Sequence, residues 1–496
     1  MSSTSRAPSA AQARTAKTPA ARTGTGGRTA GPGPGGGRGF PSALAHRGRV
    51  DALDGLRTLA VALVLVYHVD ADVMPGGAVA VDIFFTLSGF VITRLLLAEY
   101  TRTGGLDLFG FYRRRWLRLV PALLVVCAVS AVVSLTTSLW GFHRAWEAAG
   151  LSAVFVLNIV RAGDSGTYSD LTTSLAHTWS LGVEEQFYLL WPLVLLLLLR
   201  RLRARTVLWC AAGLCLLPTL WRWVLWAPDA AHRIYNGSDT RADQLLVGAL
   251  VAVVLARLRA DDPRLARLRT WSGRLTWPAL GLLALVAWQV PVTGELGAWT
   301  TLWYVAGFLG VALVSATLIT GLELRPRSRL SRVLGLAPLA WTGRNLSYGM
   351  YLWHYPVVRL LASLGVQQKD RLSATVVLTV ALALLSYVLV EAPFLRRSRS
   401  RGRAAGSERD GGVARPVAVL AAGTPVAAGG GDLVVTGSGD PVTVVGGTPP
   451  VAVGPTPGGA PGNDAADRTP TDAGEPVPGG GAGEAAGRAE SGGPVN

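Results

Sequence analysis

Half of the 496 residues are hydrophobic, only 16% are charged and the mean hydropathy is positive, which excludes an ordinary soluble globular protein. The net charge of +16 comes almost wholly from arginine, because Lys17 and Lys369 are the only lysines. The arginines lie mainly between apolar runs and in the two tails, as in cytoplasmic loops of membrane proteins rather than on a nucleic-acid-binding surface. We therefore expect an all-α polytopic protein of the plasma membrane, in contact with the lipid bilayer and without a nucleic-acid partner.

Composition predicts three regions along the chain. Residues 1–48 contain mostly Ala, Arg, Thr, Gly, Pro and Ser, so we expect a disordered basic tail. No short apolar core with a small-residue cleavage site precedes Asp51, so we expect no removable signal peptide. A membrane domain is predicted over 49–397, and the Gly-, Pro- and Ala-rich residues 398–496 are predicted to form a second disordered tail.

Ten apolar segments have the length of membrane spans. They are 52–70, 77–98, 116–139, 181–200, 206–226, 240–258, 275–291, 299–321, 343–364 and 372–392. An eleventh patch lies at 145–160, and the basic loops indicate that it does not cross. Without that crossing, every arginine cluster between spans falls in the cytoplasm, as the positive-inside rule requires. We therefore predict ten transmembrane helices, two cytoplasmic termini, and an interfacial or re-entrant segment at 145–160.

The first predicted helix carries a charge and an imidazole in an otherwise apolar sequence. Arg57 and His68 are eleven residues apart, so they share one helical face about 16 Å apart along the axis. Ionisable groups are expensive in lipid, so both are expected to face the protein interior or a wet cavity. A hydrogen-bonded packing role remains the alternative for His68.

The predicted topology assigns a depth to the other polar side chains. Toward the outer face we place Asp82, Glu184, Arg241 and Asp243. Toward the inner face, arginines between 113 and 118 gather before the third span, where they either bind an anion or anchor the helix to lipid phosphates. Ser180 suits an N-cap of the fourth span. The three cysteines show no metal-ligand spacing, so no metal is predicted.

Six segments in order resemble the acyltransferase-3 family of integral membrane O-acyltransferases. LDGLRTLAVALVLVYH is similar to the family's Arg-x10-His signature, and FYRRRWLRLVPALL to its arginine-rich third span. The other four are VDIFFTLSGFVITRLL, HTWSLGVEEQFYLLWP, DTRADQLLVGALVA and LSYGMYLWHYPVV. The segment VEAPFLRR is similar to the usual end of the domain, so the resemblance covers about residues 50–397.

The resemblance implies transfer of an acyl group, typically acetyl, from cytoplasmic acyl-CoA to a hydroxyl of an extracytoplasmic glycan, lipid-linked sugar or exported small molecule. Acyl-CoA would be a donor substrate, with no tightly bound cofactor. The implied catalytic residues are His68, Arg57 and Glu184. The implied donor-binding residues are Arg114, Arg115 and Arg118. The implied acceptor-pocket residues are Asp82, Arg241, Asp243 and His354.

Within this reading, His68 is either a general base or a transient acyl carrier, and Arg57 neutralises negative charge. Glu184 orients His68 or the acceptor, and His354 could equally be a packing residue. Acceptor selectivity is expected to come from the outer loops, above all 140–180. A transporter or flippase of a glycan intermediate is the main alternative, and a nonenzymatic scaffold is a third. The oligomeric state is left open.

Overall fold

The computed structural model describes residues 49–163, 173–291 and 299–394, so both predicted tails lie outside the described residues. Those three ranges contain helices and no β-strand. The first long helices are α1 (Asp51–Val69), α2 (Val79–Thr103), α3 (Leu108–Thr136), α6 (Trp179–Arg201), α7 (Ala204–Leu225) and α9 (Ser238–Arg257). The later ones are α10 (Pro263–Gln289), α12 (Phe308–Leu324), α15 (Ser347–Ser363) and α16 (Gln368–Ser386). The short helices are α4 (Ala145–Ala153), α5 (Leu157–Gly163), α8 (Ala231–Asn236), α11 (Thr300–Leu302), α13 (Arg329–Leu334) and α14 (Ala337–Asn345).

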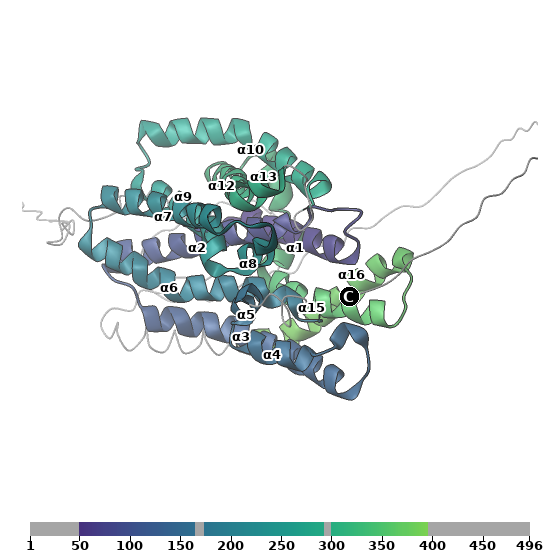
Figure 1. Ribbon diagram of the computed structural model, residues 1–496. Helices are drawn as coiled ribbons and strands as arrows, with labels where there is room; N and C mark the ends of the chain where they lie inside the picture. The colour runs from purple at the N-terminus through teal and green to yellow at the C-terminus, as the bar shows by residue number, and fades with distance from the viewer. Residues whose placement is uncertain (1–48, 164–172, 292–298, 395–496) are drawn as a thin grey trace, which may run out of the picture. The chain divides into compact units, whose positions relative to one another are not determined.

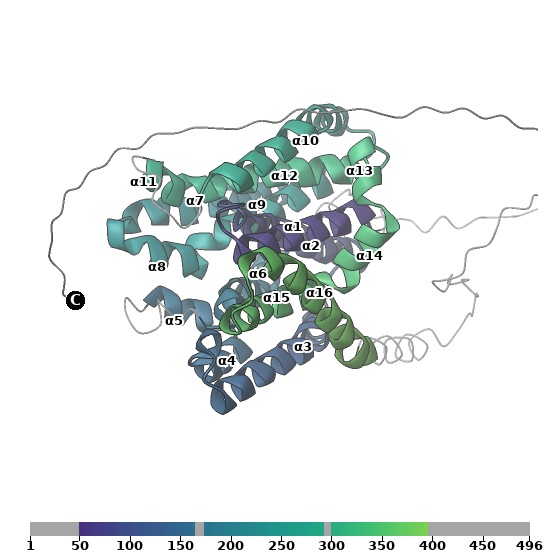
Figure 2. The same cartoon turned by 90° about the vertical axis from the view of Figure 1, so that its right-hand side faces the viewer.

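Single turns of other helix types complete the fold. Within the described ranges, 3₁₀ turns lie at Trp140–Phe142, Ala176–Thr178 and Pro228–Ala230. Two π-helical turns, at Trp303–Gly307 and Tyr387–Glu391, join α11 to α12 and extend α16. In Figures 1 and 2, α1 and α2 occupy the interior of the bundle, α10 lies along its upper edge and α3 along its lower edge.

Seven helices of the described chain are long and apolar enough to cross a membrane, which makes this a multi-pass membrane protein. They cover 51–69, 79–103, 108–136, 176–201, 204–225, 300–324 and 368–394. Each corresponds to a predicted span. Helices also form at the other three predicted positions, but the ten-span count is not confirmed. α9 begins with three charged side chains, α10 begins with an arginine-rich stretch, and α15 is only 17 residues long.

The segment predicted to be interfacial or re-entrant is a sharply bent helix pair. Residues Trp140–Ala153 and Leu157–Gly163 meet at 114°. Such a bend occurs in re-entrant loops and also in broken spans, so the choice between them stays a prediction.

The arginines near the third span lie inside its helix rather than before it. α3 begins at Leu108 because the Asp107 side chain caps it, accepting a hydrogen bond from the Gly110 amide at 2.9 Å. This early start adds two turns to the predicted span. The side chains of the arginines between 113 and 118 therefore project from the surface of α3 and not from a loop before it.

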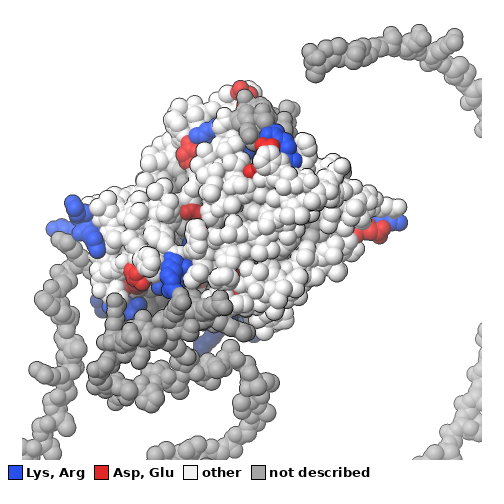
Figure 3. Space-filling view, turned by 90° about the horizontal axis from the view of Figure 1, so that it is seen from below, with Lys and Arg blue, Asp and Glu red and all other residues white. Residues whose placement is uncertain are grey.

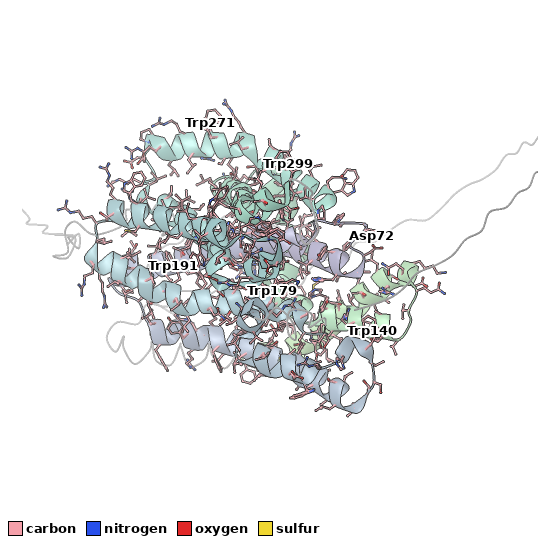
Figure 4. All side chains as sticks on the ribbon, in the orientation of Figure 1. Asp72, Trp140, Trp179, Trp191, Trp271 and Trp299 are labelled. Carbon is pink, nitrogen blue, oxygen red and sulfur yellow. The ribbon has the colours of Figure 1, made fainter. Side chains whose placement is uncertain are left out.

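Two segments predicted to lie outside the membrane, those that contain Asp72 and Trp140, lie toward the same end of the bundle. Figure 4 places Asp72 and Trp140 at that end and Trp271 toward the opposite end. Figure 3 shows a broad uncharged surface, with the visible Lys, Arg, Asp and Glu side chains gathered in a few clusters. This distribution suits an apolar belt between two polar ends.

α2 and α9 are in close contact because glycines remove the side chains where their backbones meet. A Cβ atom at Gly248 would lie 1.9 Å from the carbonyl oxygen of Thr86. One at Gly89 would lie 1.9 Å from the carbonyl oxygen of Leu245. Small residues permit such approach between membrane helices, where packing rather than the hydrophobic effect drives association.

We predict that Gly248→Val destabilises the fold by about 3 kcal/mol or more, because the added carbons meet backbone that cannot move without separating α2 from α9. The measurement is the free energy of unfolding in detergent micelles. Gly281→Ala in α10 is the matched control, since its Cβ meets nothing within 4 Å. Equal stability of the two variants would contradict the close contact.

Candidate active site

One cavity of about 570 Å³ opens among α1, α2, α3, α6 and α15. Its volume lies in the range of small-molecule sites. Among the described residues that line it, six are arginines and three are carboxylates. The arginines are Arg49, Arg57, Arg94, Arg114, Arg115 and Arg118. The carboxylates are Asp54, Glu184 and Glu185. The cavity, called the arginine cavity below, therefore favours an anion.

The Asp54 carboxylate contacts three guanidinium groups, two from the cavity lining and one from Arg344. Its carboxylate is buried and accepts two hydrogen bonds from Arg49, at 2.5 and 2.6 Å. Arg57, one turn further along α1, lies 3.4 Å from Asp54, and Arg344 lies 3.2 Å from it. Asp54 thus fixes the position of Arg57 at the cavity wall.

Of the three predicted donor-binding arginines, Arg115 is already paired. It binds Glu185 through two nitrogens, at 2.6 and 3.0 Å, and lies 3.2 Å above the Tyr188 ring. Glu184 lies 3.9 Å from Arg115 and accepts a hydrogen bond from the Tyr188 hydroxyl.

The other two predicted donor-binding arginines are less tightly paired. Arg118 donates to the carbonyl of Arg344 at 3.3 Å. Arg114 is more than half exposed, with Asp107 at 3.8 Å. Arg114 and Arg118 are therefore better placed than Arg115 to bind a phosphate.

The opposite end of the cavity is formed by Tyr351 and Ser180. Tyr351 is 8% exposed, and its hydroxyl donates to the carbonyl of His177 at 2.9 Å and also contacts the Ser180 hydroxyl. The predicted N-cap role of Ser180 is wrong, because α6 already begins at Trp179 and its cap residue, Thr178, makes no capping side-chain hydrogen bond. Ser180 instead ties α6 to α15.

Three histidines lie together beyond Tyr351. The ring centroids of His354 lie 5.0 Å from His68 and 5.0 Å from His177, and none of the three lines the arginine cavity. We call these residues the histidine cluster. His177 and His354 are buried, whereas His68 is only partly buried. Of the two groups predicted to face the protein interior or a wet cavity, Arg57 lines the arginine cavity, and His68 lies in the histidine cluster.

Hydrogen bonds determine the tautomer of His68 when both rings are neutral. Nδ1 of His354 lies 2.6 Å from the Tyr351 carbonyl, which can only accept, so Nδ1 carries the proton and Nε2 is an acceptor. His68 Nδ1 lies 3.0 Å from the Val64 carbonyl and 3.2 Å from His354 Nε2, so it donates to both. The lone pair of His68 is left on Nε2, where it can accept a proton.

The predicted acceptor-pocket carboxylates are paired inside the bundle and do not line the cavity. Asp82 lies 2.5 Å from Arg241, and Asp243 lies 2.6 Å from Arg222. All four side chains are at most 1% exposed. The Arg241 guanidinium also lies 3.9 Å from the Phe308 ring centroid. His354, the fourth predicted acceptor-pocket residue, lies in the histidine cluster. Contact of these four residues with an acceptor remains a prediction.

No set of three or more His, Cys, Asp or Glu side chains in residues 49–163, 173–291 and 299–394 is arranged to hold a metal ion.

Comparisons with known proteins identify the family. A family model described as an acyltransferase domain matches residues 50–391. The chain belongs to the acyltransferase-3 family. It is 34% identical over 354 residues to the peptidoglycan O-acetyltransferase OatA of Listeria monocytogenes, covering 69% of this chain and 55% of the relative. It is 31% identical over 379 residues to the O-acetyltransferase OatA of Staphylococcus aureus, covering 74% of this chain and 60% of the relative. The match thus spans little more than half of these relatives, and no solved structure matches significantly.

In this acyltransferase-3 protein, the structure adds four residues to the predicted set. They are Asp54, His177, Arg222 and Tyr351. Asp54 precedes Arg57 by one helical turn, and Arg222 interrupts an apolar run, so both carried a signal in the sequence. Tyr351 and His177 carried none beyond their polar side chains, because only the fold brings α15 against the start of α6.

We predict that Asp243→Asn destabilises the acyltransferase-3 domain by about 3–5 kcal/mol, because it leaves the fully buried Arg222 without its counter-charge. The measurement is the unfolding free energy in micelles. Asp261→Asn is the matched control, since Asp261 and its partner Arg259 are 78% and 70% exposed, and its effect should stay within about 0.5 kcal/mol. A combined Arg222→Met and Asp243→Leu variant should recover most of the loss. An Asp243→Asn variant as stable as the Asp261→Asn control would show that the Arg222–Asp243 pair does not stabilise the fold.

Proposed function

We propose that this protein is a membrane O-acetyltransferase that moves an acetyl group from acetyl-CoA to a hydroxyl of a cell-wall glycan of the peptidoglycan type. The observation that carries the proposal is the arginine cavity, whose far wall touches the histidine cluster. The names of both relatives support the acetyl group, and the name of the Listeria monocytogenes relative supports the peptidoglycan acceptor.

The arginine cavity provides for the donor. Coenzyme A carries several phosphates, which the Arg114 and Arg118 end of the cavity can neutralise through charge-assisted hydrogen bonds. Its narrow pantetheine arm can extend past Arg57 toward Tyr351, placing the thioester beside the histidine cluster. Arg57, about 16 Å from His68 along α1, is then placed beside the pantetheine arm, where it can neutralise negative charge on the donor.

The histidine cluster provides for the acceptor. Nε2 of His68 takes the proton of the sugar hydroxyl while the hydroxyl oxygen attacks the thioester carbonyl. The C–S bond then breaks, and the leaving thiolate receives the proton from His68. His354 holds His68 in the tautomer that this step needs. Glu184 lies in the arginine cavity, so we assign it to ordering Arg115 and Tyr188 rather than His68.

The orientation follows from the basic loops. We propose that the arginine end of the cavity faces the cytoplasm, where acetyl-CoA is made, and that both termini lie on that side. The histidine cluster then faces the outer side, where a cell-wall glycan is accessible. The two substrates approach from opposite sides of the membrane.

We predict that His68→Ala abolishes acetyl transfer, reducing kcat at least about a thousandfold, because the proton acceptor is lost. The measurement is ester formation on peptidoglycan fragments by the purified full chain in liposomes, with acetyl-CoA supplied on the arginine side. His232→Ala is the control, since that histidine lies outside the cluster. Glycan movement that needs no acetyl-CoA would indicate a transporter, and unchanged ester formation would remove His68 from the mechanism.

We predict that Arg118→Ala raises the KM for acetyl-CoA about tenfold to a hundredfold, with a smaller change in kcat, because it removes a phosphate contact distant from the reacting carbonyl. Steady-state kinetics with varied acetyl-CoA measures this. Arg267→Ala, an exposed arginine of α10 outside the cavity lining, should leave the KM unchanged. If Arg118→Ala changes only kcat, the arginine end does not bind the donor.

A further inference from the structure

Tyr351 lies between the arginine cavity and the histidine cluster, which the proposed reaction must connect. Its side chain lines the arginine cavity, and its ring centroid lies 5.4 Å from both His177 and His354. The three histidines do not line the cavity. The contacts therefore run from the cavity through Tyr351 to His354 and then to His68.

Two contacts, one with the 3₁₀ turn at Ala176–Thr178 and one with the start of α6, hold the Tyr351 hydroxyl in place. One is its hydrogen bond to the His177 carbonyl, and the other is its contact with the Ser180 hydroxyl. On the cavity side, the Phe84 ring lies at 6.4 Å from the Tyr351 ring. The side chain is thus fixed between α15, α6 and α2, with its hydroxyl fastened at the far end.

We propose that Tyr351 is a gate that closes the arginine cavity from the side of the histidine cluster and opens only for acyl transfer. Opening requires the hydroxyl to leave Ser180 and the His177 carbonyl, and the ring to leave the line between the thioester and His68. In the closed position the gate keeps water from the histidine side away from the carbonyl of a bound thioester.

The chemical consequence rests on the proposed function, whereas the separation of compartments does not. With the gate removed, water can add to the thioester carbonyl in place of the sugar hydroxyl. The C–S bond breaks and acetate, a proton and free coenzyme A are released. Tyr351 acts here as a positioning residue, because it does not react itself. By excluding water, it leaves the sugar hydroxyl as the group that reaches the thioester carbonyl.

Labelling of a cavity cysteine tests the separation directly. Val81 lines the arginine cavity and is close to cysteine in size, so Val81→Cys is introduced into the full chain after Cys127, Cys210 and Cys215 are replaced by alanine. A membrane-impermeant maleimide is applied to oriented liposomes from either side. With Tyr351 present, we expect labelling from the arginine side alone. With Tyr351→Ala, we expect labelling from both sides.

Controls and contrary outcomes are defined for this experiment. Ala98→Cys, at the arginine end of the same cavity, should label from the arginine side in both backgrounds. If Tyr351→Ala does not fold, the double variant Tyr351→Phe, Ser180→Ala keeps the ring, loses the hydroxyl contacts and should label faster from the histidine side than the parent. Labelling of Val81→Cys from the histidine side in the parent, or none from that side after the gate is altered, overturns the proposal.

Thioester hydrolysis tests the chemical consequence. Release of free coenzyme A from acetyl-CoA without acceptor should rise about tenfold in Tyr351→Ala and less in Tyr351→Phe. Tyr112→Ala, outside the cavity lining, should match the unaltered protein. Failure of the proposed function appears as an unaltered protein that neither binds nor consumes acetyl-CoA, while the labelling still reads the gate. Unchanged hydrolysis in a folded Tyr351→Ala protein that binds acetyl-CoA would show that the gate does not exclude water.

Discussion

Charges that enter this apolar bundle have to be neutralised by partners from other helices, and the positions of the inner helices depend on that requirement. Arg241 of α9 meets Asp82 of α2, and Arg222 of α7 meets Asp243 of α9. An unpaired charge at these depths would be strongly destabilising, so each pair restricts how its helices can slide or rotate. Together with the glycine contacts of α2 and α9, the pairs fix the α2 surface that carries the cavity residues Val81 and Phe84.

The charges that line the arginine cavity also need neutralising partners, but they are not matched one to one. Its described lining contains more arginines than carboxylates, and Arg115 with Glu185 accounts for one close pair. Asp54 is shared between several guanidinium groups rather than matched to one. Carboxylates outside the lining neutralise two more of its arginines, since Glu323 lies 3.1 Å from Arg94 and Asp107 lies 3.8 Å from Arg114. The remaining positive charge lies near Asp54 and Arg118, where the proposed donor would bind. The buried pairs of α2, α7 and α9 leave no such excess.

The sequence predicted well what depends on local spacing. The apolar run from Leu53 to His68 predicted a single helix, and α1 contains both Arg57 and His68. Hydropathy located helices at all ten predicted positions, but it could not tell a full span from a 17-residue helix such as α15. The start of α3 was misplaced because the cap at Asp107 lies outside the apolar run that marked the helix.

The candidate site was only partly predictable because its decisive contacts join residues far apart in the chain. Asp82 and Arg241 are 159 positions apart, and their side chains could equally have lined an acceptor pocket until their pairing was seen. The contact of Tyr351 with Ser180 spans 171 positions and has no periodic signature. Polar residues in an apolar chain can be recognised as significant, but only the fold decides which neutralise one another.

Placing Arg57 and His68 on one helix has a mechanical consequence for a reaction between compartments. A rigid α-helix holds the two groups about 16 Å apart, so neither can approach the other when a substrate binds. In the proposed reaction, the donor therefore extends along α1 from one group toward the other, and the acceptor meets it near His68. The side chain between them, Tyr351, belongs to α15 rather than α1, so it can move without disturbing either group. Because Arg57 and His68 are fixed on α1 and Tyr351 belongs to α15, Tyr351 can move aside while the distance between Arg57 and His68 stays constant.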